Sequence, residues 1–270
     1  MKKLTALLLT LALTAALFGC GAQSEPTTVP TTVPETSVPE TTVPETTVPE
    51  TTVPETTAPL HCELYLEDCP PELLMEYWDE VVHQMEYSDG TGDNTVVQKW
   101  LEPMICRIYG EPTEEDLQVL EDFFAQLNAI PNFPGIRWAR ERENENLSLN
   151  FLGKEDFEII FFDVIGGEDA WGAAQFWFWT KNNKIYEGRV GYRTDVPQED
   201  RNSIMKEEII NVMGISDTVL REDSIVYQYS NDNMELSDVD LLILELLYHP
   251  AIQPGMTVEE CHAILSELYY

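Results

Sequence analysis

The sequence predicts a layered α/β (α+β) domain in which helices pack on a mixed, twisted sheet. Residues 60–270 are long enough for one domain with a substantial core, and they are rich in aromatic and aliphatic residues. Segments with apolar residues at helical spacing lie at both ends of this region, and short β-branched and aromatic runs lie between them. A block of strands with helices before and after it is typical of a sheet covered by helices.

Each expected helix begins or ends at a recognisable signal. Pro70 and Pro71 open the first, whose apolar residues recur at helical spacing. A Ser or Thr followed three positions later by an acidic residue is the capping-box pattern, and it precedes three more helices. These pairs are Thr113 with Asp116, Ser237 with Asp240, and Thr257 with Glu260. The remaining helix covers residues 200–213 and stops at Gly214.

The expected strands are short runs rich in β-branched and aromatic residues. In chain order they cover 103–109, 136–141, 147–152, 157–162, 173–180 and 185–192. A turn at Asn182 and Asn183 separates the last two. The helix that begins after Thr113 should bury one face, which is formed by Leu117, Leu120, Phe124 and Leu127.

The N-terminus has the pattern of an export signal. Lys2 and Lys3 precede an apolar run, residues 4–18, that is too short to span a bilayer. The run ends in Leu17-Phe18-Gly19-Cys20, which resembles the lipobox of bacterial lipoproteins. That resemblance implies that residues 1–19 are a signal peptide and that Cys20 carries the lipid, the alternative being ordinary cleavage and secretion. Acyl chains gain about 0.8 kcal/mol per buried methylene, so the expected location is the outer face of the cell membrane.

A low-complexity tether follows, over residues 20–59. It repeats Thr-Thr-Val-Pro-Glu, and from Pro34 to Pro59 a proline occurs at every fifth position. Proline at this density excludes helices and sheet ladders, and the segment has too few large apolar residues to collapse. An extended stalk of this length would reach roughly 120 Å at about 3.1 Å per residue.

Charge and cysteine content limit the partners. The chain has 49 acidic and 15 basic residues, so nucleic acid is excluded as a partner and weak binding of divalent cations is favoured. Besides Cys20 there are four cysteines, whose expected pairing outside the cytoplasm is Cys62 with Cys69 and Cys106 with Cys261. The alternative is that they are free, buried thiols. The histidines do not lie at zinc-ligand spacing from them.

One segment, residues 207–217, has the spacing of the metzincin zinc-protease signature HExxHxxGxxH or HExxHxxGxxD. Glu207 and Asn211 stand where that signature has its two histidines, Glu208 where it has the catalytic glutamate, Gly214 at the turn and Asp217 at the third ligand. Both helix histidines are therefore missing. The resemblance implies a metzincin-like (zincin) layered fold whose zinc motif is degraded.

A similar resemblance extends further along the chain. Residues 224–227 resemble the Met-turn of that superfamily with valine in place of methionine, and residues 236–240 resemble the start of its closing helix. The chain also resembles the bacterial family known only as the domain of unknown function numbered 2927, which is itself similar to a zincin with a degraded metal motif. The segments that carry this likeness are 207–217, 223–225, 246–250 and 254–256.

Two chemistries remain open for this segment. Zinc requires imidazole or thiolate ligands, so no zinc cofactor is expected, but Glu207, Asn211 and Asp217 would form an oxygen-only set that suits Ca²⁺ or Mg²⁺. In a metal-dependent, peptidase-like hydrolase of this kind, the resemblance implies that Glu208 would be the general base that activates a metal-bound water. The other interpretation is a solvated acidic helix face without function.

The strand at 173–180 has aromatic residues on both faces. In the zincin frame it corresponds to the edge strand that binds extended peptide, and Trp177 and Trp179 are the candidate contacts for peptide or for cell-wall glycan. Packing in the core is the alternative. Taken together, the sequence predicts a lipid-anchored, extracytoplasmic binding module that has lost its catalytic metal. The alternatives are the hydrolase described above and a structural envelope protein that depends on its stalk and anchor.

Overall fold

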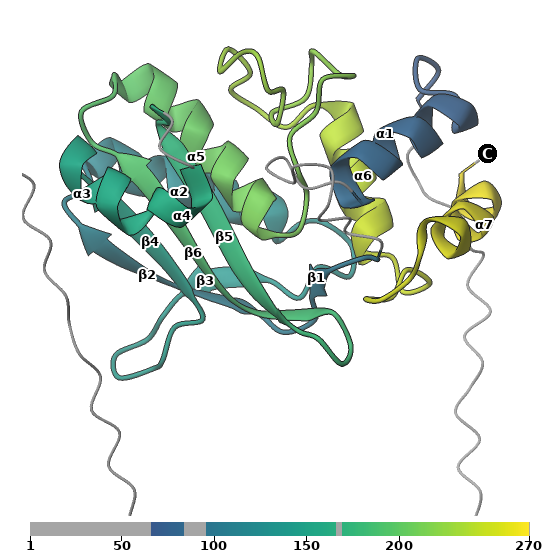
Figure 1. The fold of residues 1–270 in the computed structure, drawn as a ribbon, viewed down its shortest axis with the longest axis horizontal. Coiled ribbons are helices and arrows are strands. Elements are labelled where there is room, and N and C mark those ends of the chain that lie inside the picture. Colours follow the sequence, from purple (N-terminus) through teal and green to yellow (C-terminus); the bar gives the residue numbers. More distant parts are fainter. Residues whose placement is uncertain (1–65, 84–95, 166–168, 270) are drawn as a thin grey trace, which may run out of the picture. The chain divides into compact units, whose positions relative to one another are not determined.

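The structure, a computed structural model, describes residues 66–83, 96–165 and 169–269 (Figure 1). The expected signal peptide, Cys20, the tether and Cys62 lie outside these residues. Within the described ranges, no helix is both long and apolar enough to cross a membrane. The described residues form the predicted α/β architecture, a mostly parallel sheet packed with helices.

One sheet organises the domain, and all of its strands except β5 run parallel. The strands are β1 (Lys99–Trp100), β2 (Met104–Gly110), β3 (Ile136–Trp138), β4 (Leu147–Leu152), β5 (Gly172–Trp179) and β6 (Lys184–Arg193). Across the sheet the order is β3-β2-β4-β6-β5, and the short β1 pairs with the start of β6. The antiparallel β5 therefore forms one edge of the sheet, joined to β6 by a tight turn in which Asn183 has a φ of 53°.

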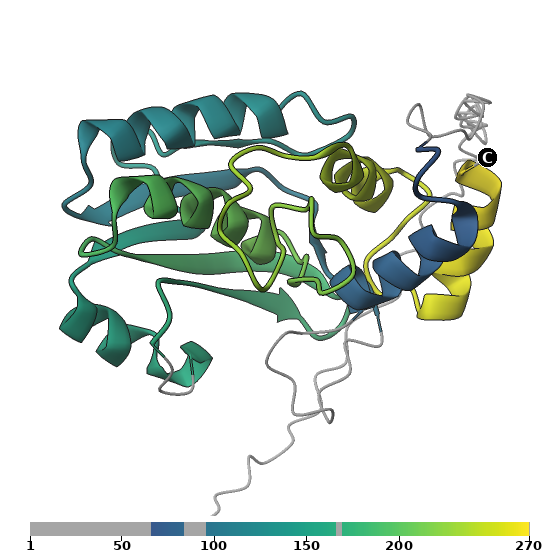
Figure 2. The same ribbon diagram turned by 90° about the horizontal axis from the view of Figure 1, so that it is seen from above.

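Helices lie on both faces of this sheet but cover them unequally (Figure 2). They are α1 (Pro71–His83), α2 (Glu114–Leu127), α3 (Lys154–Ile160), α4 (Phe162–Ile165), α5 (Gln198–Val212), α6 (Asp238–Tyr248) and α7 (Val258–Leu268). The long helices α2 and α5 cover one face, and the short α3 and α4 lie on the other, near one end of the strands. The helices α1 and α7 pack together beside the far end of the sheet.

Two glycines of β6 show which helix lies on which face. A Cβ at Gly188 would meet a methyl group of Val212 in α5, whereas a Cβ at Gly191 would meet the ring of Phe161, which ends α3. Strand β4 alternates in the same way, with Leu147, Leu149 and Phe151 buried and the residues between them only half-buried. The main hydrophobic core therefore lies on the α5 side, and the opposite face of the sheet carries polar side chains.

The five predicted helices are all present. All three capping boxes form, at Thr113, Ser237 and Thr257, and Gly214 follows α5 with a φ of 99°. One buried face was predicted incorrectly. Leu117 of α2 is 36% exposed, and Phe123 is buried in its place because the sheet lies more to that side of the helix.

One strand prediction is wrong, and another strand is shorter than predicted. Residues 157–162 form α3 and the start of α4, because Phe157 and Phe161 are four positions apart and both are buried on one helical face, while Ile159 between them is 75% exposed. The strand expected at 136–141 ends at Trp138, since the chain turns beyond it and Arg142 adopts a φ of 64°.

The expected disulfide between Cys106 and Cys261 is not formed. Cys69, Cys106 and Cys261 are free thiols and all are buried, which is the alternative that the sequence left open. Cys106 lies on β2 in the centre of the sheet and Cys261 lies on α7. Burial raises the pKa of each thiol, and that of Cys261 to about 12.

Candidate functional site

Helix α5 carries the zincin-like residues and is enclosed on most sides. One side packs on β5 and β6, and the loop over residues 213–237 covers another. That loop is held by the hydroxyl of Ser203, which donates to the carbonyl of Asn233 at 2.7 Å, and by an ion pair between Lys206 and Glu235 at 2.9 Å. Glu207 and Asn211 lie one turn apart and are half-buried rather than fully solvated.

The chain turns sharply after α5 and brings Asp217 back to the helix. Gly214 makes this turn in the left-handed region, and its α-carbon lies against the backbone of Gln98, where a Cβ would not fit. As a result, the amide nitrogen Nδ2 of Asn211 donates to Oδ1 of Asp217 at 2.9 Å. The structure therefore brings together two of the three residues that the sequence proposed as metal ligands.

The donor atoms fit a cation only in part. The amide nitrogen of Asn211, not its oxygen, faces Asp217, and Oδ1 of Asn211 is buried without a hydrogen-bond partner among the described residues. A cation held by both side chains would need the amide turned around. Over the same residues, no group of three His, Cys, Asp or Glu side chains is arranged to hold a metal ion. The structure thus joins Asn211 to Asp217 through the amide nitrogen, and we derive no reaction step through a metal.

Glu208 lies three positions before Asn211 on α5. It is buried, and a Cβ at Gly172 in β5 would stand within 2.8 Å of its Oε1 and Cγ. The carboxyl group is thus between helix and sheet. Burial, and then the nearby Glu208 carboxylate, raise the pKa of Tyr192 in β6.

The segment that resembles a Met-turn is fixed by Asp240 at the start of α6. This buried carboxylate accepts hydrogen bonds from the Ser224 hydroxyl at 2.5 Å, from the Ile225 backbone at 2.9 Å and from Ser237 at 2.9 Å. The hydroxyl of Tyr77 in α1 donates to Ser224 at 3.1 Å. Burial raises the pKa of Asp240, and this effect outweighs that of the hydrogen bonds, which lower it. The network joins the loop to two helices and has a structural role.

Trp177 and Trp179 do not lie beside α5. Phe176 and Phe178 pack against the main core on the α5 side, so the residues that alternate with them point to the opposite face. The ring of Trp177 lies 5.8 Å from the guanidinium of Arg189, and Trp179 is 55% exposed and stacks on a tyrosine of β6 with ring centroids 4.3 Å apart. The thickness of the sheet therefore separates the tryptophans from the Asn211–Asp217 pair.

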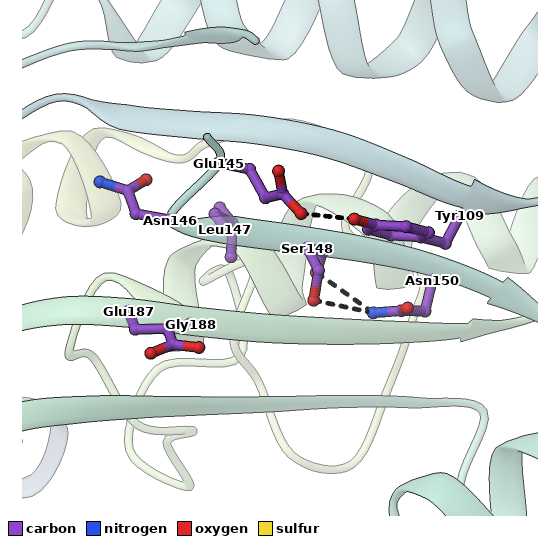
Figure 3. Close-up of a pocket in the computed structure, with 8 residues that line it drawn as sticks. All are labelled: Tyr109, Glu145, Asn146, Leu147, Ser148, Asn150, Glu187 and Gly188. Carbon is purple, nitrogen blue, oxygen red and sulfur yellow. Dashed lines mark hydrogen bonds between the residues drawn. The ribbon is translucent and has the colours of Figure 1, made fainter. Parts of the chain in front are cut away.

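The tryptophans belong instead to a surface that we call the open face, the part of the sheet that α3 and α4 leave uncovered. A pocket of about 350 Å³ lies on it beside the start of β4 (Figure 3). Its lining comes from three neighbouring strands and the loop before β4: Tyr109, Glu145, Asn146, Leu147, Ser148, Asn150, Glu187 and Gly188. The volume falls in the range of about 300–1,000 Å³ that is usual for small-molecule sites.

The polar groups on one side of the pocket are fixed by one another. Tyr109 donates its hydroxyl hydrogen to Glu145, and Nε of Arg107 donates to the same carboxylate at 2.9 Å. These hydrogen bonds, that of Tyr109 first, lower the pKa of Glu145 to about 2, so this acceptor is charged at neutral pH. The amide of Asn150 donates to the carbonyl of Val190 at 2.9 Å, which fixes its orientation in the sheet.

Arg189 lies at the centre of the open face. In the register of the sheet it stands opposite Ser148 on one side and opposite Gln175 on the other. Its guanidinium lies 4.9 Å from the Phe161 ring centroid and 5.8 Å from that of Trp177. Both Nε of Arg189 and Oε1 of Gln175 are buried and have no hydrogen-bond partner among the described residues.

Sequence reasoning found the tryptophans but missed Arg189, Gln175 and the pocket. One signal was present. Strand β4 lies in the middle of a parallel sheet, where both faces are normally apolar, yet Ser148 and Asn150 alternate with its apolar residues. A polar alternation in a central strand indicates that one face of the sheet is uncovered.

The comparisons with known proteins identify the family of the domain but assign no activity to it. The family model described as "Protein of unknown function (DUF2927)" matches residues 71–267. No curated protein and no solved structure matches the chain. The matched region includes α5, the Asn211–Asp217 pair and the open face. Since it also covers well over half of the sequence, the chain belongs to the DUF2927 family of proteins of unknown function.

Proposed function

We propose that this protein is a lipid-anchored interaction module on the outer face of the cell membrane, and that it binds cell-wall material through the open face. The anchor is Cys20 and the tether is residues 20–59. The domain is proposed to be a metzincin-like fold that no longer works as a zinc protease. Its function is then to hold a ligand near the membrane.

Several features support the zincin likeness. The antiparallel β5 is an edge strand, and α5 follows the strand beside it. Gly214 turns the chain after α5, so that Asp217, at the third ligand position, meets Asn211, at the second. Neither of these side chains is an imidazole or a thiolate, which zinc would require.

The observation that carries the binding proposal is the polar and aromatic pocket on the open face. Exposed aromatic rings beside fixed hydrogen-bonding groups are typical of sites that bind an amphipathic ligand from water. Trp179 and Tyr109 are 55% and 43% exposed, and Glu145 is fixed by two hydrogen bonds. None of these groups is needed for the main core, which lies on the α5 side.

A sedimentation assay tests this proposal. The chain from residue 20, with Cys20→Ser to remove the lipid, is mixed with isolated cell-wall sacculi, which contain both glycan and peptide. We expect the protein to pellet with the sacculi, and the double variant Trp177→Ala, Trp179→Ala to remain in solution. Tyr229→Ala is the matched control, because this tyrosine is 71% exposed in the loop on the helix side. Equal pelleting of all three proteins, or no pelleting of any, would refute the proposal.

The second candidate is the metal-dependent hydrolase. The orphaned Oδ1 of Asn211 beside Asp217 favours it, because a cation could satisfy that buried oxygen. The burial of Glu208 between α5 and β5 does not favour the hydrolase. This function requires turnover of a peptide substrate that a chelator abolishes and that Glu208→Gln removes. Turnover that survives both would exclude it.

A further inference from the structure

Arg189 is unusual among the arginines of this chain. Acidic residues outnumber basic ones by 49 to 15, and the arginines at positions 107, 137, 142, 193, 201 and 221 each form an ion pair. Among the described residues, Arg140 also lacks one, but it is exposed, whereas Arg189 is half-buried. Over the described ranges, no carboxylate lies within ion-pair distance of Arg189. In so acidic a protein, an unpaired arginine needs a physical explanation.

The surroundings of Arg189 hold it in place without neutralising it. The rings of Phe161 and Trp177, at 4.9 and 5.8 Å, stack against the guanidinium, which limits its movement. Its Nε–H is buried and unpartnered, as is the neighbouring acceptor Oε1 of Gln175. Buried groups of this kind are costly to leave without a hydrogen bond, so an unmatched donor and an unmatched acceptor at paired positions of β6 and β5 indicate a ligand that supplies both partners.

We propose that Arg189 and the adjacent pocket bind a carboxylate-bearing glycan. This inference rests on the proposed binding function and names the ligand class. The sugar carboxylate accepts from Nε–H of Arg189, and a sugar hydroxyl donates to Oε1 of Gln175. Further hydroxyls meet Ser148, which faces Arg189 across the sheet, and the carboxylates of Glu145 and Glu187 in the pocket (Figure 3). The exposed rings of Trp179 and Tyr109 offer flat surfaces for the apolar faces of sugar rings.

The same features disfavour other ligands. A peptide that adds to the sheet needs a free strand edge, but β4 and β6 are paired on both sides, so the pocket presents no free backbone. A dense polyanion would be repelled by Glu145 and Glu187 and by the strongly acidic protein. An isolated carboxylate on a hydroxyl-rich ligand matches one arginine among hydrogen-bond acceptors.

The test uses defined probes and the chain from residue 20 with Cys20→Ser. Its binding to a tetrasaccharide that carries a single uronic acid, to the same tetrasaccharide with that carboxyl group reduced, and to a tetrapeptide with a single glutamate is followed by tryptophan fluorescence and calorimetry. We expect the acidic sugar to bind at least about tenfold more tightly than the neutral sugar, since a hydrogen bond to a charged group is worth that factor or more. The peptide should bind more weakly than the acidic sugar.

Two variants test the role of Arg189. Arg189→Gln should lose about tenfold in affinity for the acidic sugar and little for the neutral one. Gln175→Glu places a carboxylate opposite Arg189, so it should also abolish the preference for acid while its unfolding temperature stays at or above that of the parent chain. Arg142→Gln is the control, because it makes the same charge change at a side chain that is 90% exposed.

Four results would overturn the inference. They are equal affinity for acidic and neutral sugar, unchanged binding in both Arg189→Gln and Gln175→Glu, tighter binding of the peptide, and no binding of any probe. If the protein pellets with sacculi and the tryptophan variant does not, the proposed function survives such a result and only the ligand class is wrong. If neither protein pellets, the open face itself is not a binding site.

Discussion

The buried ion pair between Asp116 and Arg201 joins α2 to α5, and its removal should have a large effect on stability. Both side chains are buried, and Nε of Arg201 donates to Oδ1 of Asp116 at 2.9 Å. The same carboxylate accepts from Nε2 of Gln198 at 2.6 Å and from the backbone N–H of Thr113 at 2.7 Å. Asp116→Ala would leave the Arg201 guanidinium buried without its counter-charge.

Removing one partner of a buried pair typically costs about 3–5 kcal/mol, which is the expected loss in the free energy of unfolding for Asp116→Ala. Replacing both partners by apolar side chains avoids an isolated buried charge. The double variant Asp116→Ala, Arg201→Met should therefore be more stable than Asp116→Ala alone. Glu114→Ala, in the exposed first turn of the same helix, should cost no more than about 1 kcal/mol.

Urea unfolding followed by circular dichroism measures these differences on the chain from residue 20 with Cys20→Ser. The slope of the transition should stay the same, so that the midpoint reports stability. A loss below about 1 kcal/mol for Asp116→Ala, or a double variant less stable than Asp116→Ala alone, would refute the reasoning.

The pair also predicts a pH dependence. Burial alone would raise the pKa of Asp116, but hydrogen bonds from Arg201, Thr113 and Gln198 outweigh it and lower the pKa below its ordinary value. A depressed carboxyl pKa contributes stability that is present above the unfolded pKa of about 4 and is lost as the pH falls through the folded value. The stability difference between the parent chain and Asp116→Ala should therefore shrink below about pH 4. A constant difference from pH 6 to pH 2.5 would contradict this assignment.

Three further predictions concern the open face, the metal question and the anchor. In Gly191→Ala the new methyl group would lie within 2.7 Å of three ring carbons of Phe161. Urea unfolding should therefore show a free energy of unfolding lower by about 1–3 kcal/mol. An unchanged free energy of unfolding would mean that the ring moves freely. Calcium, magnesium or EDTA should change the thermal midpoint of the parent chain no more than that of Asp217→Ala. A cation that binds the folded state at a hundred times its dissociation constant would stabilise it by about 2.7 kcal/mol. A shift of that size in the parent chain alone would support the hydrolase. In cells, Cys20→Ser should move the full-length protein from the membrane pellet to the soluble fraction and abolish labelling by palmitate, and retention in the pellet would refute lipid anchoring.

The helices could be predicted because their ends are decided by local chemistry. Thr113, Ser237 and Thr257 each hydrogen-bond a backbone N–H three positions ahead, and this contact needs nothing from the rest of the chain. Gly214 is similar, since only glycine adopts its φ without strain. The helices within residues 154–165 could not be predicted in this way, because their dense apolar residues fit a strand as well as a helix. Only the packing of Phe157 and Phe161 against the sheet selects the helix.

The candidate site could be predicted only where its residues are close in sequence. Asn211 and Asp217 lie six positions apart, so the spacing of one motif was enough to place them together. The open face depends on which strands are neighbours. Arg189 meets Ser148, Gln175 and Phe161 only after the sheet has formed, and no local pattern specifies that order.

The three free thiols bear on how this protein matures. Cys69, Cys106 and Cys261 are 0%, 1% and 0% exposed, and burial keeps each thiol protonated, which makes it a poor nucleophile. Under the proposed export, the unfolded chain would meet oxidants before these side chains are covered. Rapid burial of the core is then what protects the thiols from wrong cross-links, and slow-folding variants should accumulate mixed disulfides that the parent chain avoids.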